Sequence, residues 1–215
     1  MALVSHKHKW IFFHLYKCGG NSLRVVLKEN FEGCEEMYGV HCLPIDLKAH
    51  FDKNIGKGAW ESYYKFSIVR NPFDLLVSHL FYCKRAQGHG WHDIIIKEKM
   101  DSDFMNGFTK LYFKTLEEHK IPGNRPAGSN KVVTLLQYLS DEKGKILVDF
   151  VGKLENINES QKTIFAKLDL PPQAIPRINA SGNRERNYRQ YYNATSQKLV
   201  EKYFAKDLKH FNYEF

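Results

Sequence analysis

Cysteine, proline and glycine are sparse in this chain, which has 4 Cys, 7 Pro and 14 Gly among 215 residues. These low counts exclude collagen-like and low-complexity proteins. The cysteines show neither CxxC pairing nor zinc-ligand spacing, which favours reduced thiols. The chain is also long enough to bury a large core without a disulfide or metal staple. The composition is therefore that of an ordinary globular protein.

Long apolar runs are missing as well. No segment approaches the ~18 apolar residues that a membrane helix needs. The apolar run at residues 10–13 is too short for the core of a signal peptide, and no small-residue cleavage site follows it. These absences predict a cytoplasmic protein without a membrane span.

Positive charge, by contrast, is in excess. Lys and Arg number 32 against 24 Asp and Glu, a difference of +8 that predicts an anionic partner. The lysines are spread along the chain and do not form a stripe with interleaved aromatic residues, which disfavours a nucleic-acid-binding module. Hydrophobic residues at 43% argue against disorder. We expect one domain covering residues 1–215, because domains commonly reach this length.

Strand-like and helix-like segments alternate along the chain. A continuous apolar run predicts a buried strand at residues 10–15, and mainly apolar segments predict two more at residues 64–69 and 146–151. Apolar residues at helical spacing predict helices at residues 23–29, 72–83, 104–119, 158–168 and 195–206. Asn71 is a suitable N-cap and Pro72 a suitable first residue for the second of these helices. The pattern predicts an α/β fold of three layers, with a central, mostly parallel sheet flanked by helices.

The first candidate site is the loop Lys17-Cys-Gly-Gly-Asn-Ser22, where a strand leads into a helix. Glycines let backbone N–H groups approach an anion, the helix N-terminus adds partial positive charge, and Lys17 and Ser22 add a cation and a hydroxyl. The alternative is a tight turn with an exposed lysine. The chain contains no Walker A motif, GxxxxGK[ST], which weakens the ATPase and kinase interpretations.

The second candidate site pairs Arg70, after the second strand, with Ser78 in the following helix. The carboxyl ends of parallel strands open toward one sheet edge, where ligands bind, and an arginine there can grip a phosphate with two N–H bonds. The alternative is that Arg70 pairs with Asp74 and that Ser78 is an ordinary helix residue.

Together the two loops resemble sulfotransferases that use 3′-phosphoadenosine-5′-phosphosulfate (PAPS). The similarity is greatest to the branch of carbohydrate O-sulfotransferases and small bacterial members. It implies a P-loop-like fold, in-line transfer of a sulfuryl group to a hydroxyl or amine, release of PAP, and no metal. Three residues depart from the family pattern: Tyr16 replaces Pro, Cys18 replaces Thr, and Asn21 stands where Thr is common. The segments that carry the resemblance are residues 11–23, 66–78, 150–156, 188–192, 203–207 and 211–215.

The resemblance also implies roles for individual residues. Lys17 would stabilise the leaving bridging oxygen, and the loop residues Cys18, Gly19, Gly20, Asn21 and Ser22 would hold the 5′-phosphate. Arg70 and Ser78 would hold the 3′-phosphate. The polar loop at residues 179–186 would close over the nucleotide, and Arg184 or Arg186 would reach the 3′-phosphate. A solvated charged loop is the alternative there.

A general base must take the proton of the acceptor, and His41 is our choice among the ten histidines. Related enzymes place a histidine before a short helical segment in this interval, here about residues 44–54. His50 is the main rival.

Two other functions remain open: a P-loop-like nucleotide kinase, and a non-catalytic anion-binding module. The acceptor also remains open among a sugar, a small metabolite, a lipid and an aromatic compound. Residues 84–131, which are basic and aromatic, are expected to shape its pocket.

Overall fold

The computed structural model describes residues 2–37, 42–85, 104–117, 134–176, 178 and 187–215. The chain divides into two compact units. The first unit comprises Met1–Arg70 and Leu135–Asn179, and the second comprises Asn71–Thr134 and Ala180–Phe215. The Lys17 loop and Arg70 therefore belong to the first unit, and Ser78 belongs to the second.

A mixed five-stranded sheet forms the centre of the first unit, in the order β3-β1-β2-β4-β5. Strand β1 pairs antiparallel with both β2 and β3, whereas β2, β4 and β5 run parallel. Parallel neighbours place the chain segments that follow β2, β4 and β5 at one edge of the sheet. The strands are β1 (Ala2–Ser5), β2 (Trp10–Phe13), β3 (Glu35–Met37), β4 (Tyr64–Val69) and β5 (Phe150–Lys153).

The α/β class is confirmed, but the prediction of a mostly parallel sheet is wrong for half of the strand pairs. The prediction overlooked β1 and β3, which are short and form the antiparallel side of the sheet. The third predicted strand also lies later than expected. Ile146 forms an isolated bridge with Ser140, and regular pairing with β4 begins only at Phe150.

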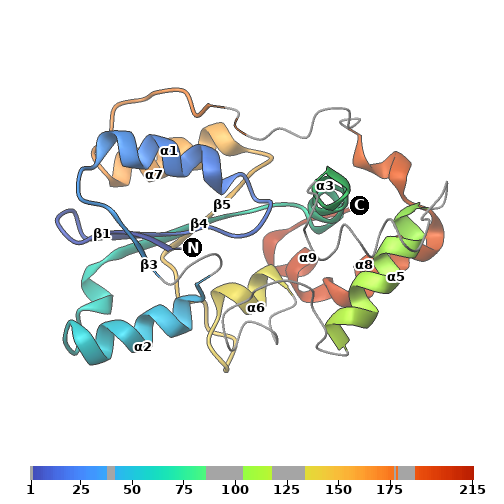
Figure 1. The fold of residues 1–215 in the computed structure, drawn as a ribbon, viewed down its shortest axis with the longest axis horizontal. Coiled ribbons are helices and arrows are strands. Elements are labelled where there is room, and N and C mark those ends of the chain that lie inside the picture. Colours follow the sequence, from blue (N-terminus) through green and yellow to red (C-terminus); the bar gives the residue numbers. More distant parts are fainter. Residues whose placement is uncertain (1, 38–41, 86–103, 118–133, 177, 179–186) are drawn as a thin grey trace. The chain divides into compact units, whose positions relative to one another are not determined.

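Helices cover both faces of this sheet, so the first unit has three layers (Figure 1). One face carries α1 (Gly20–Asn30) and α7 (Ile157–Lys167), and the other carries α2 (Pro44–Asn54). The unit also contains η1 (Trp60–Ser62) and α6 (Leu135–Leu139). The core beneath α1 and α7 consists of Leu3, Trp10, Phe12, Leu23, Val26, Leu27, Phe31, Phe66, Ile68, Ile164 and Phe165.

The second unit is helical in its described residues. Its predicted helix from 195 to 206 is two helices, which meet at Phe204, the C-cap of the first and the N-cap of the second. Asn71 accepts a hydrogen bond from the N–H of Phe73 at 3.0 Å, as expected of an N-cap. The elements are α3 (Pro72–Arg85), α5 (Phe104–Glu117), η3 (Tyr188–Tyr191), α8 (Ala194–Tyr203) and α9 (Ala205–Phe211).

Aromatic side chains dominate the core of the second unit. Phe73, Phe108, Phe113 and Phe204 are almost completely buried. The rings of Phe113 and Tyr203 stack with centroids 4.0 Å apart. Such contacts add to the free energy of burial, so the unit has a core of its own.

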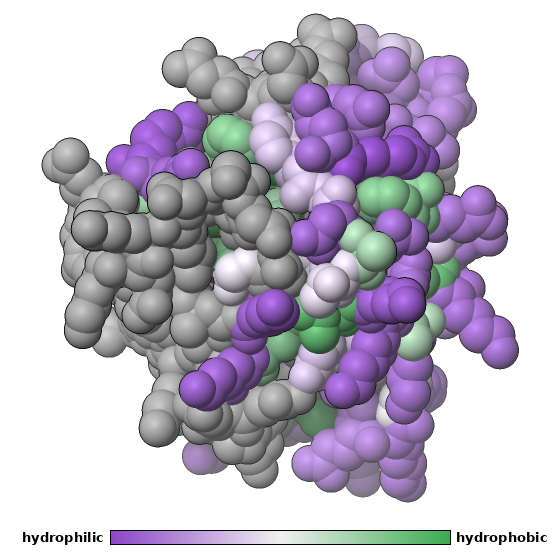
Figure 2. All heavy atoms as spheres, turned by 90° about the vertical axis from the view of Figure 1, so that its right-hand side faces the viewer, coloured by the Kyte–Doolittle hydropathy of each residue, from purple (hydrophilic) through white to green (hydrophobic). Residues whose placement is uncertain are grey.

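The surface of the described residues is largely polar. Figure 2 shows hydrophilic residues over most of the coloured part of one face, with apolar residues in small separate areas. Among the described residues, the exposed large hydrophobic side chains are those of Ile55 and Ile178. Within the described part of the chain, no helix has the length and hydrophobicity needed to cross a membrane.

Candidate active site

The Lys17 loop turns the chain sharply between β2 and α1. Lys17 has a φ of 58° and Gly19 a φ of 76°, so two residues of the loop are in the left-handed region. This conformation costs a non-glycine residue free energy, and Lys17 therefore needs support from its surroundings.

The N-terminus of α1 keeps its partial positive charge. Its N-cap, Gly19, makes no side-chain cap hydrogen bond, and the first turn contains no acidic residue. By contrast, Asp46 lies in the first turn of α2 and Glu159 in that of α7. An anion at α1 would therefore meet a helix dipole that no carboxylate in the first turn of the helix offsets.

Both glycines of the loop face neighbouring side chains of the protein. A β-carbon at Gly19 would lie 2.6 Å from Cδ1 of Leu154, and one at Gly20 would overlap the ring of His14. We expected these glycines to allow an anion to approach. The structure adds that each of them lets a side chain pack against the loop.

Arg70 lies directly after β4, the parallel neighbour of β2. Its Nη1 donates a hydrogen bond of 3.0 Å to the carbonyl oxygen of Lys17. The structure therefore brings Lys17 and Arg70 together, although 53 positions of sequence separate them. The first unit thus presents two cations and a helix N-terminus at one edge of its sheet, which suits a ligand with several negative charges.

Burial shifts the pKa of two other groups at the loop. The pKa of the Cys18 thiol rises to about 12 because the group is buried, although the charge of Arg70 opposes the shift. The pKa of His14 falls to about 4, because of burial and, to a smaller extent, the positive charges of the N-terminus, Arg24 and Lys17. Both groups are therefore neutral at physiological pH, and the positive charge of Lys17 and Arg70 is not cancelled by a thiolate at Cys18.

Comparison with known proteins identifies the family. The family model described as "Sulfotransferase family" matches residues 1–214. The chain belongs to the sulfotransferase family. A protein of Archaeoglobus fulgidus, described only as an uncharacterized protein, is 26% identical over 135 residues, which is 63% of this chain and 90% of that protein. No solved structure matches.

Membership of this family makes the protein a transferase of sulfuryl groups. The match covers the Lys17 loop, Arg70 and Ser78, so all three lie within the sulfotransferase sequence. Within the described residues, no group of three or more His, Cys, Asp or Glu side chains is arranged to hold a metal ion.

Ser22 and Ser78 of this sulfotransferase lie in different units. Ser22 is half-buried in the first turn of α1, and its Oγ accepts a hydrogen bond of 3.1 Å from the N–H of Ile178. Ser78 is buried in α3, with 2% of its surface exposed. Asn21 is half-buried beside Ser22.

The predicted base and the late-loop arginine lie outside the described residues, since these exclude 38–41 and 179–186. The structure does describe the helix expected after His41, and α2 spans the predicted residues 44–54. The rival base, His50, is half-buried on α2, and its Nδ1 lies 2.9 Å from Nδ2 of Asn54.

Three neighbours of the site were not predicted. Leu154 and His14 pack against the loop glycines, and the hydroxyl of Tyr138 donates to the carbonyl oxygen of Cys42. Leu154 does lie within the segment 150–156 that carries the family resemblance, so the sequence contained a signal for it. Nothing in the sequence pointed to Tyr138, which is 96 positions from Cys42.

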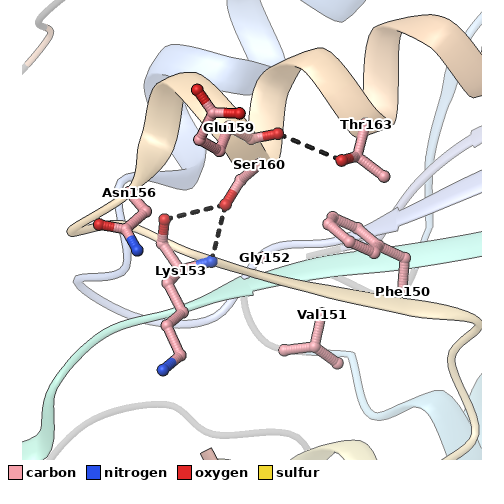
Figure 3. Close-up of a pocket in the computed structure, with 8 residues that line it drawn as sticks. All are labelled: Phe150, Val151, Gly152, Lys153, Asn156, Glu159, Ser160 and Thr163. Carbon is pink, nitrogen blue, oxygen red and sulfur yellow. Dashed lines mark hydrogen bonds between the residues drawn. The ribbon is translucent and has the colours of Figure 1, made fainter.

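A separate pocket of about 210 Å³ lies between β5 and α7 (Figure 3). Ser160 is one of the lining residues and is bonded to the backbone of Lys153. Its Oγ accepts a hydrogen bond of 2.8 Å from the N–H of Lys153 and donates one of 3.0 Å to the carbonyl oxygen of Lys153. The ammonium group of Lys153 points away from Ser160, and the lining includes the carboxylate of Glu159. This pocket therefore suits an anionic ligand less well than the Lys17 loop does.

Proposed function

We propose that this sulfotransferase uses PAPS as its donor and binds the 5′-phosphosulfate at the Lys17 loop. The observation that carries the proposal is the left-handed turn of Lys17 and Gly19 at an uncapped helix N-terminus, with Arg70 bonded to the same turn. Backbone amides at such a turn and helix end stabilise phosphate groups.

Each residue of the loop has a defined task in this proposal. The backbone amides of residues 19–22 and the Ser22 hydroxyl hold the 5′-phosphate. The ammonium group of Lys17 stabilises the negative charge that develops on the bridging oxygen as the S–O bond to phosphate breaks. Arg70 and Ser78 hold the 3′-phosphate. The late loop at residues 179–186 closes over the nucleotide, and Arg184 or Arg186 reaches the 3′-phosphate from it.

The transfer itself needs a base and an aligned acceptor. In the proposed step, the acceptor oxygen (or nitrogen) forms a new bond to sulfur as the bond from sulfur to the 5′-phosphate breaks. His41 takes the acceptor proton, and PAP leaves. No metal takes part in this step.

The broader expectations follow from the same proposal. They are a single sulfotransferase domain with a P-loop-like three-layer fold, a cytoplasmic location, and a carbohydrate or small-molecule acceptor. The excess of positive charge, +8, suits a donor with three acidic groups and leaves further charge for an acidic acceptor.

Binding of PAP and transfer of label from ³⁵S-PAPS test the proposal. The wild type should bind PAP in calorimetry and, in the presence of EDTA, transfer label to at least one member of an acceptor panel. Lys17→Met should lower the rate by roughly 10²–10³-fold, as the loss of one transition-state donor does elsewhere. Lys57→Met, at an exposed position after α2, is the matched control and should keep the wild-type rate.

Other outcomes would point to the two alternative functions. Transfer of phosphate from ATP that stops when EDTA removes Mg²⁺ would favour a nucleotide kinase. Tight binding of PAP with no transfer to any acceptor would favour a non-catalytic module. A wild-type protein that does not bind PAP contradicts the proposal altogether.

A further inference from the structure

We propose that Arg70 is also a positioning residue, which holds Lys17 in its working conformation through the Lys17 carbonyl. This inference rests on the function proposed above, in which Arg70 is only a ligand of the 3′-phosphate. It gives Arg70 a second task, on the 5′ side of the donor.

The first support is the hydrogen bond between the two residues. Nη1 of Arg70 donates to the carbonyl oxygen of Lys17 over 3.0 Å. A guanidinium donor makes this a charge-assisted bond, which is stronger than a bond between neutral groups. The acceptor is the carbonyl oxygen of Lys17, the residue whose backbone is in the left-handed region, with a φ of 58°.

The register of the sheet explains why Arg70 can reach this carbonyl. Strands β2 and β4 are parallel, and Phe13 pairs with Ser67. Lys17 follows Phe13 by four residues and Arg70 follows Ser67 by three, so both leave the sheet at the same edge. The bond therefore ties together the two loops that follow neighbouring strands.

The backbone N–H of Arg70 also lies against the loop, at Cys18. The charge of Arg70 and its backbone N–H both lower the pKa of the Cys18 thiol, opposing the larger effect of burial. Cys18 is the residue between Lys17 and Gly19, and 1% of its surface is exposed. Arg70 thus faces two consecutive residues of the turn.

The loop is also braced at its other residues, but by apolar or neutral groups. Leu154 packs at Gly19, and the ring of His14 packs at Gly20. Arg70 differs from both because it holds a backbone oxygen, and the direction of that oxygen sets the plane of the peptide between Lys17 and Cys18. Loss of Arg70 would therefore remove one hydrogen bond of this peptide and leave the longer one, of 3.4 Å, from the N–H of Cys18 to the carbonyl oxygen of Leu15. The direction of the Lys17 side chain would then be less well fixed.

The test separates the two tasks of Arg70 with two ligands. PAP carries a 3′-phosphate, whereas adenosine 5′-phosphosulfate carries none. Affinities for both are measured by calorimetry, with competition against PAP for the weaker ligand, in the wild type, Arg70→Met and Arg70→Lys. Ser78→Ala is the control, because Ser78 is expected to contact the 3′-phosphate alone.

Arg70→Met should lower the affinity for adenosine 5′-phosphosulfate by roughly tenfold, in line with the loss of a hydrogen bond to a charged group. Arg70→Lys keeps a charge for the 3′-phosphate but lacks the planar fork, so it should recover PAP affinity in part and adenosine 5′-phosphosulfate affinity hardly at all. Ser78→Ala should lower the affinity for PAP and leave the affinity for adenosine 5′-phosphosulfate unchanged.

A role limited to the 3′-phosphate predicts a different pattern: both Arg70 variants would bind adenosine 5′-phosphosulfate as the wild type does. That result overturns the inference and leaves the proposed function standing. A wild type that binds neither ligand overturns both. If Arg70→Met does not fold, the affinities of Arg70→Lys for the two ligands are compared with those of the wild type instead. The urea midpoint of unfolding of Arg70→Lys is measured to show that this variant is folded.

Discussion

The side chain of Leu154 occupies the space that a β-carbon at Gly19 would need, with Cδ1 2.6 Å from that position. Leu154 follows β5 directly, and its N–H donates to the carbonyl oxygen of Val69 at the end of β4. The ends of three parallel strands therefore meet at the Lys17 loop, and the shape of the loop depends on all of them.

Replacement of Gly19 by alanine should destabilise the first unit and abolish PAP binding. The new β-carbon would meet Leu154, and φ at this residue is +76°. Gly33→Ala is the matched control, since Gly33 has a similar φ of +69° but nothing within 4 Å of the added carbon. Urea unfolding should show a loss of about 1 kcal/mol for the control, from backbone strain alone, and a larger loss for Gly19→Ala.

The double variant Gly19→Ala/Leu154→Ala separates the backbone strain at position 19 from the steric clash with Leu154. It should lose less stability than the sum of the two single variants, because removal of the leucine makes room for the new carbon. Equal losses of stability for Gly19→Ala and Gly33→Ala would show that the Leu154 side chain can move away from the new β-carbon without loss of stability.

The stability of the protein should fall as the pH is lowered through the range set by His14. Its pKa is lowered from 6.5 to about 4, so between these values the unfolded chain takes up a proton that the folded chain does not. Linkage then makes the free energy of unfolding decrease from pH 6.5 downward and level off near pH 4, by on the order of 3 kcal/mol.

Urea unfolding at several pH values, compared between the wild type and His14→Gln, measures this contribution. The variant should show a smaller loss of stability over the same pH range. Parallel curves for the two proteins would mean that His14 titrates normally in the folded state.

His41→Ala should abolish sulfuryl transfer and leave PAP binding intact, because a base acts on the acceptor and does not hold the nucleotide. His50→Ala is the matched comparison and should retain transfer, since His50 lies on α2 with its Nδ1 2.9 Å from the Asn54 amide nitrogen. Full turnover of His41→Ala together with an inactive His50→Ala would reverse the assignment.

Cys18 and Cys42 should react slowly with a thiol reagent at neutral pH. Both are buried, and burial raises the pKa of each thiol to about 12, which leaves little thiolate. Cys34 is only half-buried and should account for the fastest phase of the reaction with Ellman's reagent. Cys34→Ser should remove that phase, and a fast phase that persists in Cys34→Ser would show that the loop opens readily.

Local signals in the sequence predicted much of the first unit. Strand β4 and helix α2 have the predicted bounds, because one is a mainly apolar segment that leads into a turn and the other begins at a proline. Strands β1 and β3 were missed because they have only 4 and 3 residues, and β3 consists of Glu-Glu-Met. Strands this short owe their conformation to pairing with their neighbours, which no local pattern reveals.

The third predicted strand shows the same limit. The apolar run from Ile146 to Val151 has the composition of a strand, yet only its last two residues lie in β5. The chain first turns back at residues 141–145, where the side chain of Asp141 accepts hydrogen bonds from the N–H groups of Lys143 and Lys145. Tertiary pairing with β4 then decides where the strand begins.

For the site, the sequence by itself determined the chemical groups and their order along the chain: Lys17 and two glycines after one strand, and Arg70 after another. Residue type and strand–loop–helix spacing are local properties, so these could be found without a structure. Only the tertiary structure decided that Arg70 bonds to the carbonyl of Lys17, and that Leu154 and His14 pack against the glycines. The contacts of Arg70 and Leu154 depend on the register of parallel strands 50 or more residues apart, and long-range register is set by packing of the whole sheet.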